Sequence, residues 1–159
     1  MPSQHNHHYS QQDRQRPPPP FLDVSRIRFG DSISADLYAD IAEKMANTIA
    51  DSGDDNEDKK TQLRRFYGEL YLWNEKVNAR NPNQKEDPQS LYNKFAPLIK
   101  MLRAKVAYAK GRRHVSGNFV TLFDTVINQI NGPATLKQAK LFMEAFMGFY
   151  TATPKGQQD

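Results

Sequence analysis

The sequence predicts an all-α fold, a five-helix bundle with a disordered N-terminal tail. Apolar residues recur at intervals of three and four along five segments, the period of a helix with one buried face. No segment shows the strict apolar-polar alternation that a half-buried strand requires. With 159 residues and 38% hydrophobic content, the chain has the size of one domain and enough apolar surface for a core. The expected helices span residues 32–50, 61–80, 91–112, 117–131 and 135–150.

Composition divides the chain into a central domain and two tails. Residues 1–30 are rich in Pro, Gln and His, carry four consecutive prolines at 17–20, and offer little apolar surface to offset the entropy of ordering. We expect them to form a disordered tail. A helical bundle domain at 31–151 and a flexible C-terminal tail at 152–159 are expected to follow.

The first helix is expected to begin at a cap formed by Asp31 and Ser32. The acidic segment 51–58 ends it; its acids lack the ligand spacing of a calcium loop, so we interpret it as a solvated linker. The apolar face of this helix consists of Ile33, Leu37, Ile41, Met45 and Ile49.

The second helix is expected to start at a Thr61 cap. Pro88 suits the first turn of the third helix, which is expected to end near Gly111. Pro97 lies inside it and should kink it, because the proline ring removes one backbone donor. The apolar positions of these two helices are Leu63, Phe66, Leu70, Trp73 and Val77, then Leu91, Phe95, Leu98, Leu102, Val106 and Ala109.

The last two helices also carry start signals. Ser116 can cap the fourth helix, and Thr135 with Gln138 forms a capping box for the fifth. The fourth helix has the clearest amphipathic stripe, and the fifth turns aromatic residues inward. Those positions are Phe119, Leu122, Phe123, Val126, Ile127 and Ile130, then Ala139, Phe142, Phe146 and Phe149 or Tyr150.

Charge is distributed unevenly along the chain. Between Lys59 and Arg113 there are fourteen Lys or Arg against four Asp or Glu, a balance of +10. The whole chain carries +4, so the remainder carries −6. A local basic field attracts polyanions, and nucleic acid is the polyanion this pattern suggests.

Several function classes are poorly supported. The chain has no cysteine, which excludes disulfides and thiolate metal sites and suits a reducing cytoplasm. Outside the tail the only histidine is His114, and no phosphate loop or nucleophile elbow is present. We therefore expect no enzymatic activity, no metal and no cofactor. No apolar run is long enough for a membrane span, so we expect a cytoplasmic protein without membrane contact.

The basic residues of the third helix divide into two groups on a helical wheel. Lys94, Lys105, Tyr108 and Arg112 fall along one shoulder of the apolar face and form a basic stripe. Its cations could contact phosphates and its tyrosine could stack on a base or ribose. The alternative is that the tyrosine flanks the core and the lysines extend from its edge. Arg103 and Lys110 fall on the other shoulder, and Lys100 points away toward water.

Arg64 and Arg65 lie in the first turns of the second helix, where the positive end of the helix dipole disfavours cations. Their position makes better sense beside a phosphate. The end of the third helix carries Arg112, Arg113 and His114. The helix dipole favours cations at a C-terminal end, so their presence there does not require a functional explanation.

Four motifs in order resemble the small subunit of type III-A CRISPR effector (Csm) complexes. They are QLRRFY before a Leu/Trp-rich helix, KVAYAKGR, FVTLFDTVI and LKQAKLFMEAFMGFY. The resemblance covers roughly residues 59–151. By position, Arg64 and Arg65 match the basic pair of the first family motif, and Tyr108 and Arg112 match the Tyr and Arg of the second. Lys110 stands where the family often has a small residue.

The resemblance implies a non-catalytic helical subunit. Such subunits stack head to tail in several copies beside the other effector subunits and hold target RNA paired to guide RNA through backbone contacts. The candidate RNA-binding residues are Arg64, Arg65, Lys94, Arg103, Lys105, Tyr108, Lys110, Arg112 and Arg113.

Two other functions remain open. One is a helical protein-interaction module whose basic surface docks an acidic protein. The other is helix-turn-helix DNA binding across GRRHVSGN, although the helix that follows carries almost no cations for a groove.

Overall fold

The computed structural model describes residues 17–158, and all regular structure within that range is helical. The predicted all-α fold is therefore confirmed. A π-helical turn, η2 (Leu37–Ile41), leads into the first α-helix, and a short 3-10 helix, η3 (Lys155–Gln157), follows the last one. The α-helices are α1 (Ala42–Ala50), α2 (Lys60–Asn78), α3 (Pro88–Lys100), α4 (Leu102–Gly111), α5 (Gly117–Asn128) and α6 (Pro133–Ala152).

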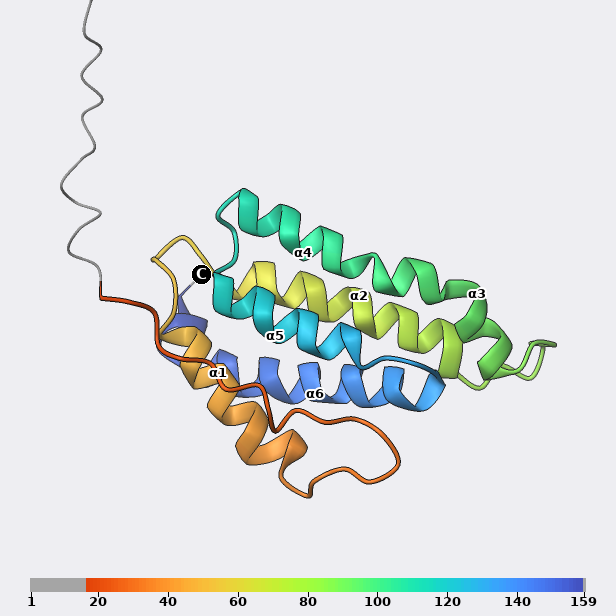
Figure 1. Cartoon of the computed structure of the whole chain (residues 1–159). Coiled ribbons are helices and arrows are strands. Elements are labelled where there is room, and N and C mark those ends of the chain that lie inside the picture. The colour runs from red at the N-terminus through yellow and green to blue at the C-terminus, as the bar shows by residue number, and fades with distance from the viewer. Residues whose placement is uncertain (1–16, 159) are drawn as a thin grey trace, which may run out of the picture.

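Aromatic side chains of α5 and α6 form the centre of the bundle. Helix α6 packs against α1 and α2, and α4 packs against α5 (Figure 1). Phe119 stacks on Phe123 with ring centroids 5.8 Å apart and contacts Phe146 at 6.3 Å. Phe66 of α2 reaches both rings of α5, at 5.8 and 5.3 Å. Burying one such side chain stabilises the fold by about 1.5–3 kcal/mol, so this cluster fixes α2 against the core.

The first and third helices differ most from the expectation. The first helix begins at Leu37 rather than near residue 32, and Ile33 is 37% exposed. The expected third helix is divided at Met101 into α3 and α4. Pro97 cannot donate a backbone hydrogen bond, and the distortion appears one turn later. There the N–H of Ala104 bonds to the Met101 carbonyl at 2.9 Å, an interval of three residues instead of four.

The caps are confirmed in part. Ser116 caps α5, its hydroxyl accepting from the N–H of Phe119 at 3.2 Å. Thr61 lies inside α2, whose N-cap is Lys59 without a side-chain cap bond. Thr135 is the third residue of α6 rather than its cap. Its hydroxyl accepts from backbone N–H groups just before the helix, at 2.8 and 3.1 Å.

Residues 17–30 pack along the bundle, although the disordered tail was expected to extend to residue 30. This extended segment, here called the strap, runs beside α1 (Figure 1). Leu22 and Ile27 are 7% and 2% exposed. The apolar residues of this segment are too few to form a periodic pattern. The proline-rich composition of residues 1–30 therefore led to the prediction of disorder. The rest of the expected tail, residues 1–16, lies outside the described residues.

Two glutamine side chains hold the strap. The Gln129 amide accepts from the Phe29 N–H at 2.9 Å and donates to the Ile27 carbonyl at 2.7 Å. The Gln138 amide bonds both the N–H and the carbonyl of Gly30, at 2.8 and 2.9 Å. Each amide therefore satisfies two backbone groups that have no strand partner.

The chain after α6 also packs, in contrast to the flexible tail expected at 152–159. Thr153 and Gly156 are buried. The Lys155 ammonium donates to two backbone carbonyls of the linker before α2, at 3.1 and 2.9 Å. The C-terminal segment thus ties that linker to α6.

Replacing Gly156 by alanine should destabilise the fold. A Cβ there would lie 1.9 Å from the backbone oxygen of Tyr150, so η3 would have to move away from α6. We expect a loss of about 1–3 kcal/mol in the free energy of unfolding, measured by urea denaturation. Gly148→Ala is the control: it lies inside α6 with no atom within 4 Å of the new methyl and should gain about 0.5–1 kcal/mol. Equal midpoints for Gly156→Ala and the wild type would contradict the packing described.

Candidate nucleic-acid interface

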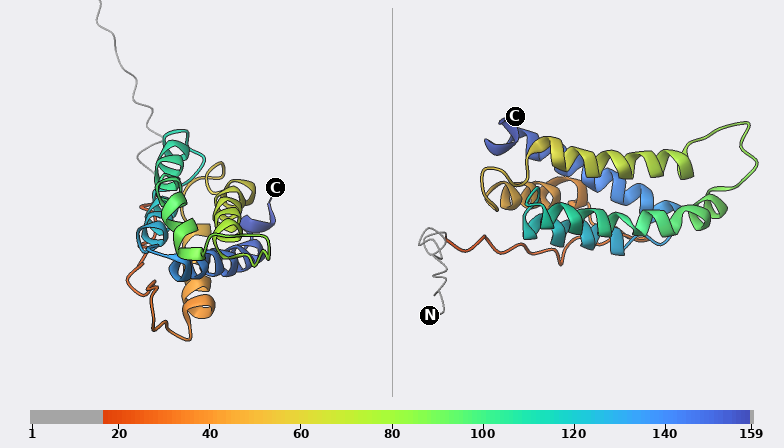
Figure 2. Two further views of the ribbon diagram at one scale, coloured as in Figure 1. Left: turned by 90° about the vertical axis from the view of Figure 1, so that its right-hand side faces the viewer. Right: turned by 90° about the horizontal axis from the view of Figure 1, so that it is seen from above.

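A groove of about 640 Å³ runs between α2 and α4. Figure 2 shows α2 lying alongside the α3–α4 pair. At one end α2 packs on α3, where the rings of Trp73 and Phe95 lie 5.3 Å apart, whereas α4 packs on α5 instead. The hollow therefore opens beside α4, with the buried Phe66 and Ala109 as its floor. Its walls carry Gln62, Arg65 and Glu69 from α2, and Met101, Ala104, Lys105, Tyr108, Arg112 and His114 from α4 and its flanking turns.

Helical periodicity places these side chains on facing surfaces. Arg65 and Glu69 are four residues apart and share one face of α2. Lys105, Tyr108 and Arg112 follow each other at intervals of three and four and share one face of α4. Three of the four residues of the predicted basic stripe, Lys105, Tyr108 and Arg112, thus face the wall of α2 that carries Arg65.

One ion pair crosses the groove. The Lys105 ammonium lies 2.9 Å from the Glu69 carboxylate, and both side chains are partly exposed. Arg65 has no ion-pair partner among residues 17–158, and its side chain is exposed. Lys105 is therefore neutralised within the groove, whereas Arg65 is available to an anion.

Tyr108 and Arg112 form a second unit on α4. Tyr108 is 68% exposed, which is unusual for a large aromatic ring. The Arg112 guanidinium lies 6.0 Å from the ring centroid, with a nitrogen 3.5 Å from the hydroxyl. A cation beside an open aromatic face can contact a phosphate while the ring stacks on a base or ribose.

Two predicted residues lie outside the groove. Arg64 is exposed but does not line it. It precedes Tyr67 by one turn on α2, and Tyr67 and Tyr71 lie on the side of Lys140 in α6. Lys94 belongs to α3, where its ammonium is 3.9 Å from Glu86 and 5.5 Å from the Phe95 ring.

Three further predicted cations face other directions. The Arg103 side chain lies 3.5 Å from the Asp124 carboxylate of α5. Lys110 is exposed beside the start of α5 and the acidic linker. Arg113 is exposed in the turn after α4 with φ +59°, a left-handed conformation in which the N–H of His114 reaches back to the Ala109 carbonyl at 2.9 Å. The nine candidates therefore do not form one surface.

Lys100 does not simply face water, and that expectation is wrong. Its ammonium donates to the Ile127 carbonyl at 2.7 Å, with the Asn128 carbonyl at 3.4 Å, at the C-terminal end of α5. Carbonyls at a helix end attract a cation. Burial, with a smaller contribution from Arg103, lowers the pKa of Lys100. A helical wheel could not identify this contact because it contains no second helix.

The sequence prediction missed three polar residues that line the groove. Gln62 and Glu69 flank Arg65 at helical spacing, so the wheel used for the third helix would have found them on α2. His114 also lines the groove, although it was predicted only to lie in a basic turn. Glu69 matters most, because it neutralises a cation of the opposite wall.

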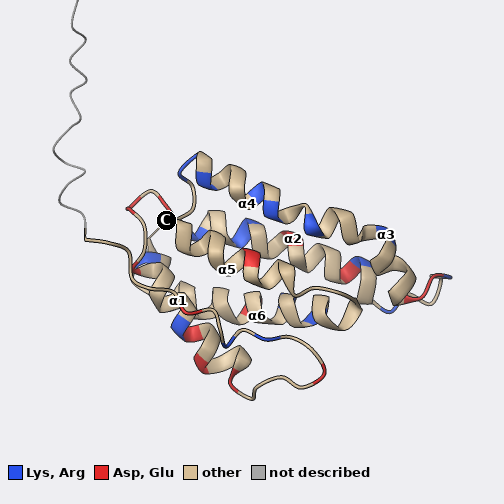
Figure 3. Ribbon diagram, in the orientation of Figure 1, with Lys and Arg blue, Asp and Glu red and all other residues tan. Residues whose placement is uncertain are grey.

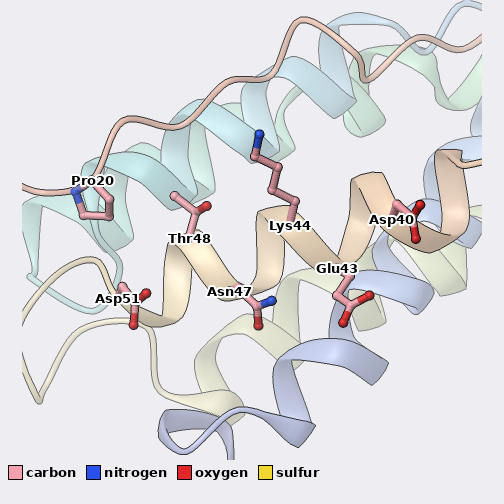
Figure 4. A pocket seen from close by; sticks show the side chains of 7 residues that line it. All are labelled: Pro20, Asp40, Glu43, Lys44, Asn47, Thr48 and Asp51. Atoms are coloured by element: carbon pink, nitrogen blue, oxygen red, sulfur yellow. The ribbon is translucent and has the colours of Figure 1, made fainter.

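Acidic residues gather on other parts of the molecule. Figure 3 shows acidic positions on the linker after α1 and on α1 itself, and basic positions along α4 and the turn that follows. Between the strap and α1 lies a hollow of about 370 Å³. In Figure 4, Lys44 and Thr48 point toward the strap while Glu43 points away, so the acids of α1 do not converge.

Neither a metal cluster nor a membrane span is found in the described part of the chain. Within residues 17–158, no three His, Asp or Glu side chains come together as a metal site. No helix there is both long and apolar enough to cross a bilayer.

Comparison with known proteins gives one match. A family model described as Csm2 Type III-A matches residues 34–155. The match begins after the strap and includes both walls of the groove. Searches of curated proteins and of solved structures found no match.

Proposed function

Because the chain belongs to the Csm2 Type III-A family, the small-subunit family of the type III-A CRISPR (Csm) complex, we propose that it holds target RNA paired to guide RNA in that complex. In this proposal the subunit is not catalytic. It contacts the RNA backbone through the α2–α4 groove, and several copies stack head to tail along the RNA.

The observation that supports this function best is the pairing of Arg65 on α2 with the Tyr108–Arg112 unit on α4, across one open groove. Cations and an exposed ring suit phosphates and sugars of any sequence. Gln62 is the one amide among the residues that line this groove, so few groups there could read base edges. Sequence selection then remains with guide pairing, as RNA-guided recognition requires.

Head-to-tail stacking needs two different complementary surfaces on each copy. The exposed acids Asp51 and Asp55 of the linker and the exposed cations Arg80 and Lys85 of the loop between α2 and α3 supply opposite charges at opposite ends of the bundle (Figure 3). We include contact between such segments of neighbouring copies in the proposal. The mass of the reconstituted complex at low and high salt checks it, because charge contacts weaken as salt rises.

Salt titration of target binding tests the RNA function. Each phosphate neutralised on a single strand contributes about −0.7 to the slope of log affinity against log salt. Replacing Glu69 by glutamine removes a negative charge and frees Lys105, so the slope of the reconstituted complex should steepen by up to about 0.7 for each variant subunit that contacts RNA. Two targets of unrelated sequence, each with its matching guide, should show the same change.

Lys44→Ala is the control, because Lys44 is an exposed cation on α1, away from the groove. It should leave the slope unchanged. A slope near zero for the wild-type complex, or weaker binding by Glu69→Gln, would instead favour a basic surface that docks an acidic protein.

A further inference from the structure

Asp58 joins three separate parts of the fold just before α2. Its side chain has no exposed surface, and its backbone adopts a left-handed conformation with φ +57°. Its Oδ1 accepts from the Ser116 N–H at 2.7 Å, and its own N–H donates to the His114 carbonyl at 3.0 Å. Its carbonyl accepts from the Tyr150 hydroxyl of α6. One buried residue therefore connects the start of α2, the α4–α5 turn and α6.

The second carboxylate oxygen of Asp58 is buried without a hydrogen-bond partner in the described part of the chain. A buried oxygen of this kind is costly to ionise. The charged or titratable groups around it are Lys155, Glu57, His114 and Tyr150. The Lys155 ammonium donates to backbone carbonyls of the linker, so its attraction to the carboxylate is indirect.

Burial raises the pKa of Asp58 to about 6, against the hydrogen bonds from Ser116 and the charge of Lys155, which lower it. Glu57 raises it further. The Asp58 carboxyl therefore gains or loses its proton close to neutral pH, at the point where the start of α2, the α4–α5 turn and α6 meet. The protonated carboxyl fits its dry surroundings. When it is ionised, the Ser116 N–H binds Oδ1 more strongly, but the second oxygen is left charged without a partner. The cost of burying that charge exceeds the gain from the hydrogen bond, so the ionised form favours an arrangement that admits water.

The position of this junction links it to the groove. The α4–α5 turn that Asp58 holds contains His114, and Arg112 lies two residues before His114. The helix that Asp58 precedes carries Arg65 on the opposite wall. Any loosening between Asp58 and the turn alters the relation of the two walls.

We propose that Asp58 is a positioning residue for the α2–α4 groove, which keeps the α4–α5 turn against the start of α2 when protonated and loosens that contact when ionised. The effect on RNA rests on the function proposed above, whereas the effect on the spacing of the walls does not. The two effects can therefore be measured separately.

Spin labels measure the spacing of the walls. The chain has no cysteine, so Thr61→Cys on α2 and Ala107→Cys on α4, both exposed, create one unique labelled pair. We expect one narrow distance distribution at pH 5 and a broader one at pH 8. Asp58→Asn, a neutral side chain of the same shape that tolerates the left-handed backbone, should keep the narrow distribution at both pH values. Identical distributions in wild type and Asp58→Asn at both pH values would overturn the proposal.

Affinity for target RNA is the second readout. In the reconstituted complex, wild type should lose roughly fivefold in affinity between pH 5.5 and 8, the low end of coupling between two sites, and Asp58→Asn should lose less. In a parallel series both proteins also carry His114→Gln, which removes any contribution of this groove side chain to the pH profile. If pH alters the spacing but no variant binds RNA, the RNA function fails and the positioning role stands. If RNA binds with the same pH profile in wild type and Asp58→Asn, the positioning role fails.

Discussion

Reversing both groove arginines, Arg65→Glu together with Arg112→Glu, is expected to lower the affinity of the reconstituted complex for target RNA by roughly 100-fold. Both side chains are exposed, on opposite walls of one groove, and neither has an acidic partner among residues 17–158. A hydrogen bond to a charged group contributes about 1.5–3 kcal/mol, so two lost phosphate contacts account for about 3 kcal/mol or more. Binding of labelled target RNA at fixed salt measures the loss.

A matched double variant distinguishes the effect of the groove arginines from the effect of a change in net charge. Lys44→Glu with Lys110→Glu changes the net charge of the chain equally, but both residues are exposed outside the groove. Only a small loss that disappears at high salt is expected from it. Equal losses in the two double variants would mean that total charge, rather than the α2–α4 groove, determines RNA affinity.

The free energy of unfolding should fall as pH rises through the range in which Asp58 ionises. Its pKa in the folded protein is about 6, above the ordinary value of 3.8, so the folded state retains the proton longer than the unfolded state. The stability due to this group is therefore complete below about pH 4 and is lost as pH rises through 6. The difference in pKa corresponds to a loss of about 3 kcal/mol. Urea denaturation at several pH values measures it.

Asp58→Asn isolates this contribution. The variant should be more stable than wild type at pH 8, and the advantage should shrink toward pH 4 as wild type takes up its proton. Capping carboxylates such as Asp87, whose pKa is lowered by hydrogen bonds to Ser90, have the opposite pH dependence but cancel in the difference. Asp55→Asn, at an exposed position of the same linker, should follow wild type. A constant difference between Asp58→Asn and wild type at every pH would contradict the assignment.

The buried state of Asp58 also corrects the view of the linker 51–58 as a solvated acidic surface. The sequence shows only that acids are concentrated there. It does not show that one of them turns inward, because that depends on the N–H of Ser116 and the hydroxyl of Tyr150, which are distant in sequence. Asp58 therefore cannot contribute to a surface that meets a neighbouring copy.

Periodicity predicted much of the fold and one wall of the groove. The spacing of Lys105, Tyr108 and Arg112 was enough to place them on one face, since those positions depend on a single helix. It could not show that Glu69 of another helix neutralises Lys105. Nor could it distinguish Arg64 from Arg65, because adjacent residues point to different sides and only packing decides which side faces α4. The sequence thus predicted which face of its helix each residue occupies. The ion pairs could not be predicted, because they depend on side chains of neighbouring helices.

The hydrogen bonds of the strap have a consequence for biosynthesis. Phe29 and Gly30 are bonded by side chains 100 and 108 residues further along the chain, on Gln129 and Gln138. At a ribosomal rate of about 5–20 residues per second, the strap leaves the ribosome roughly 5–20 s before its partners are made. The bonds that hold the strap can therefore form only after α5 and α6 have been synthesised.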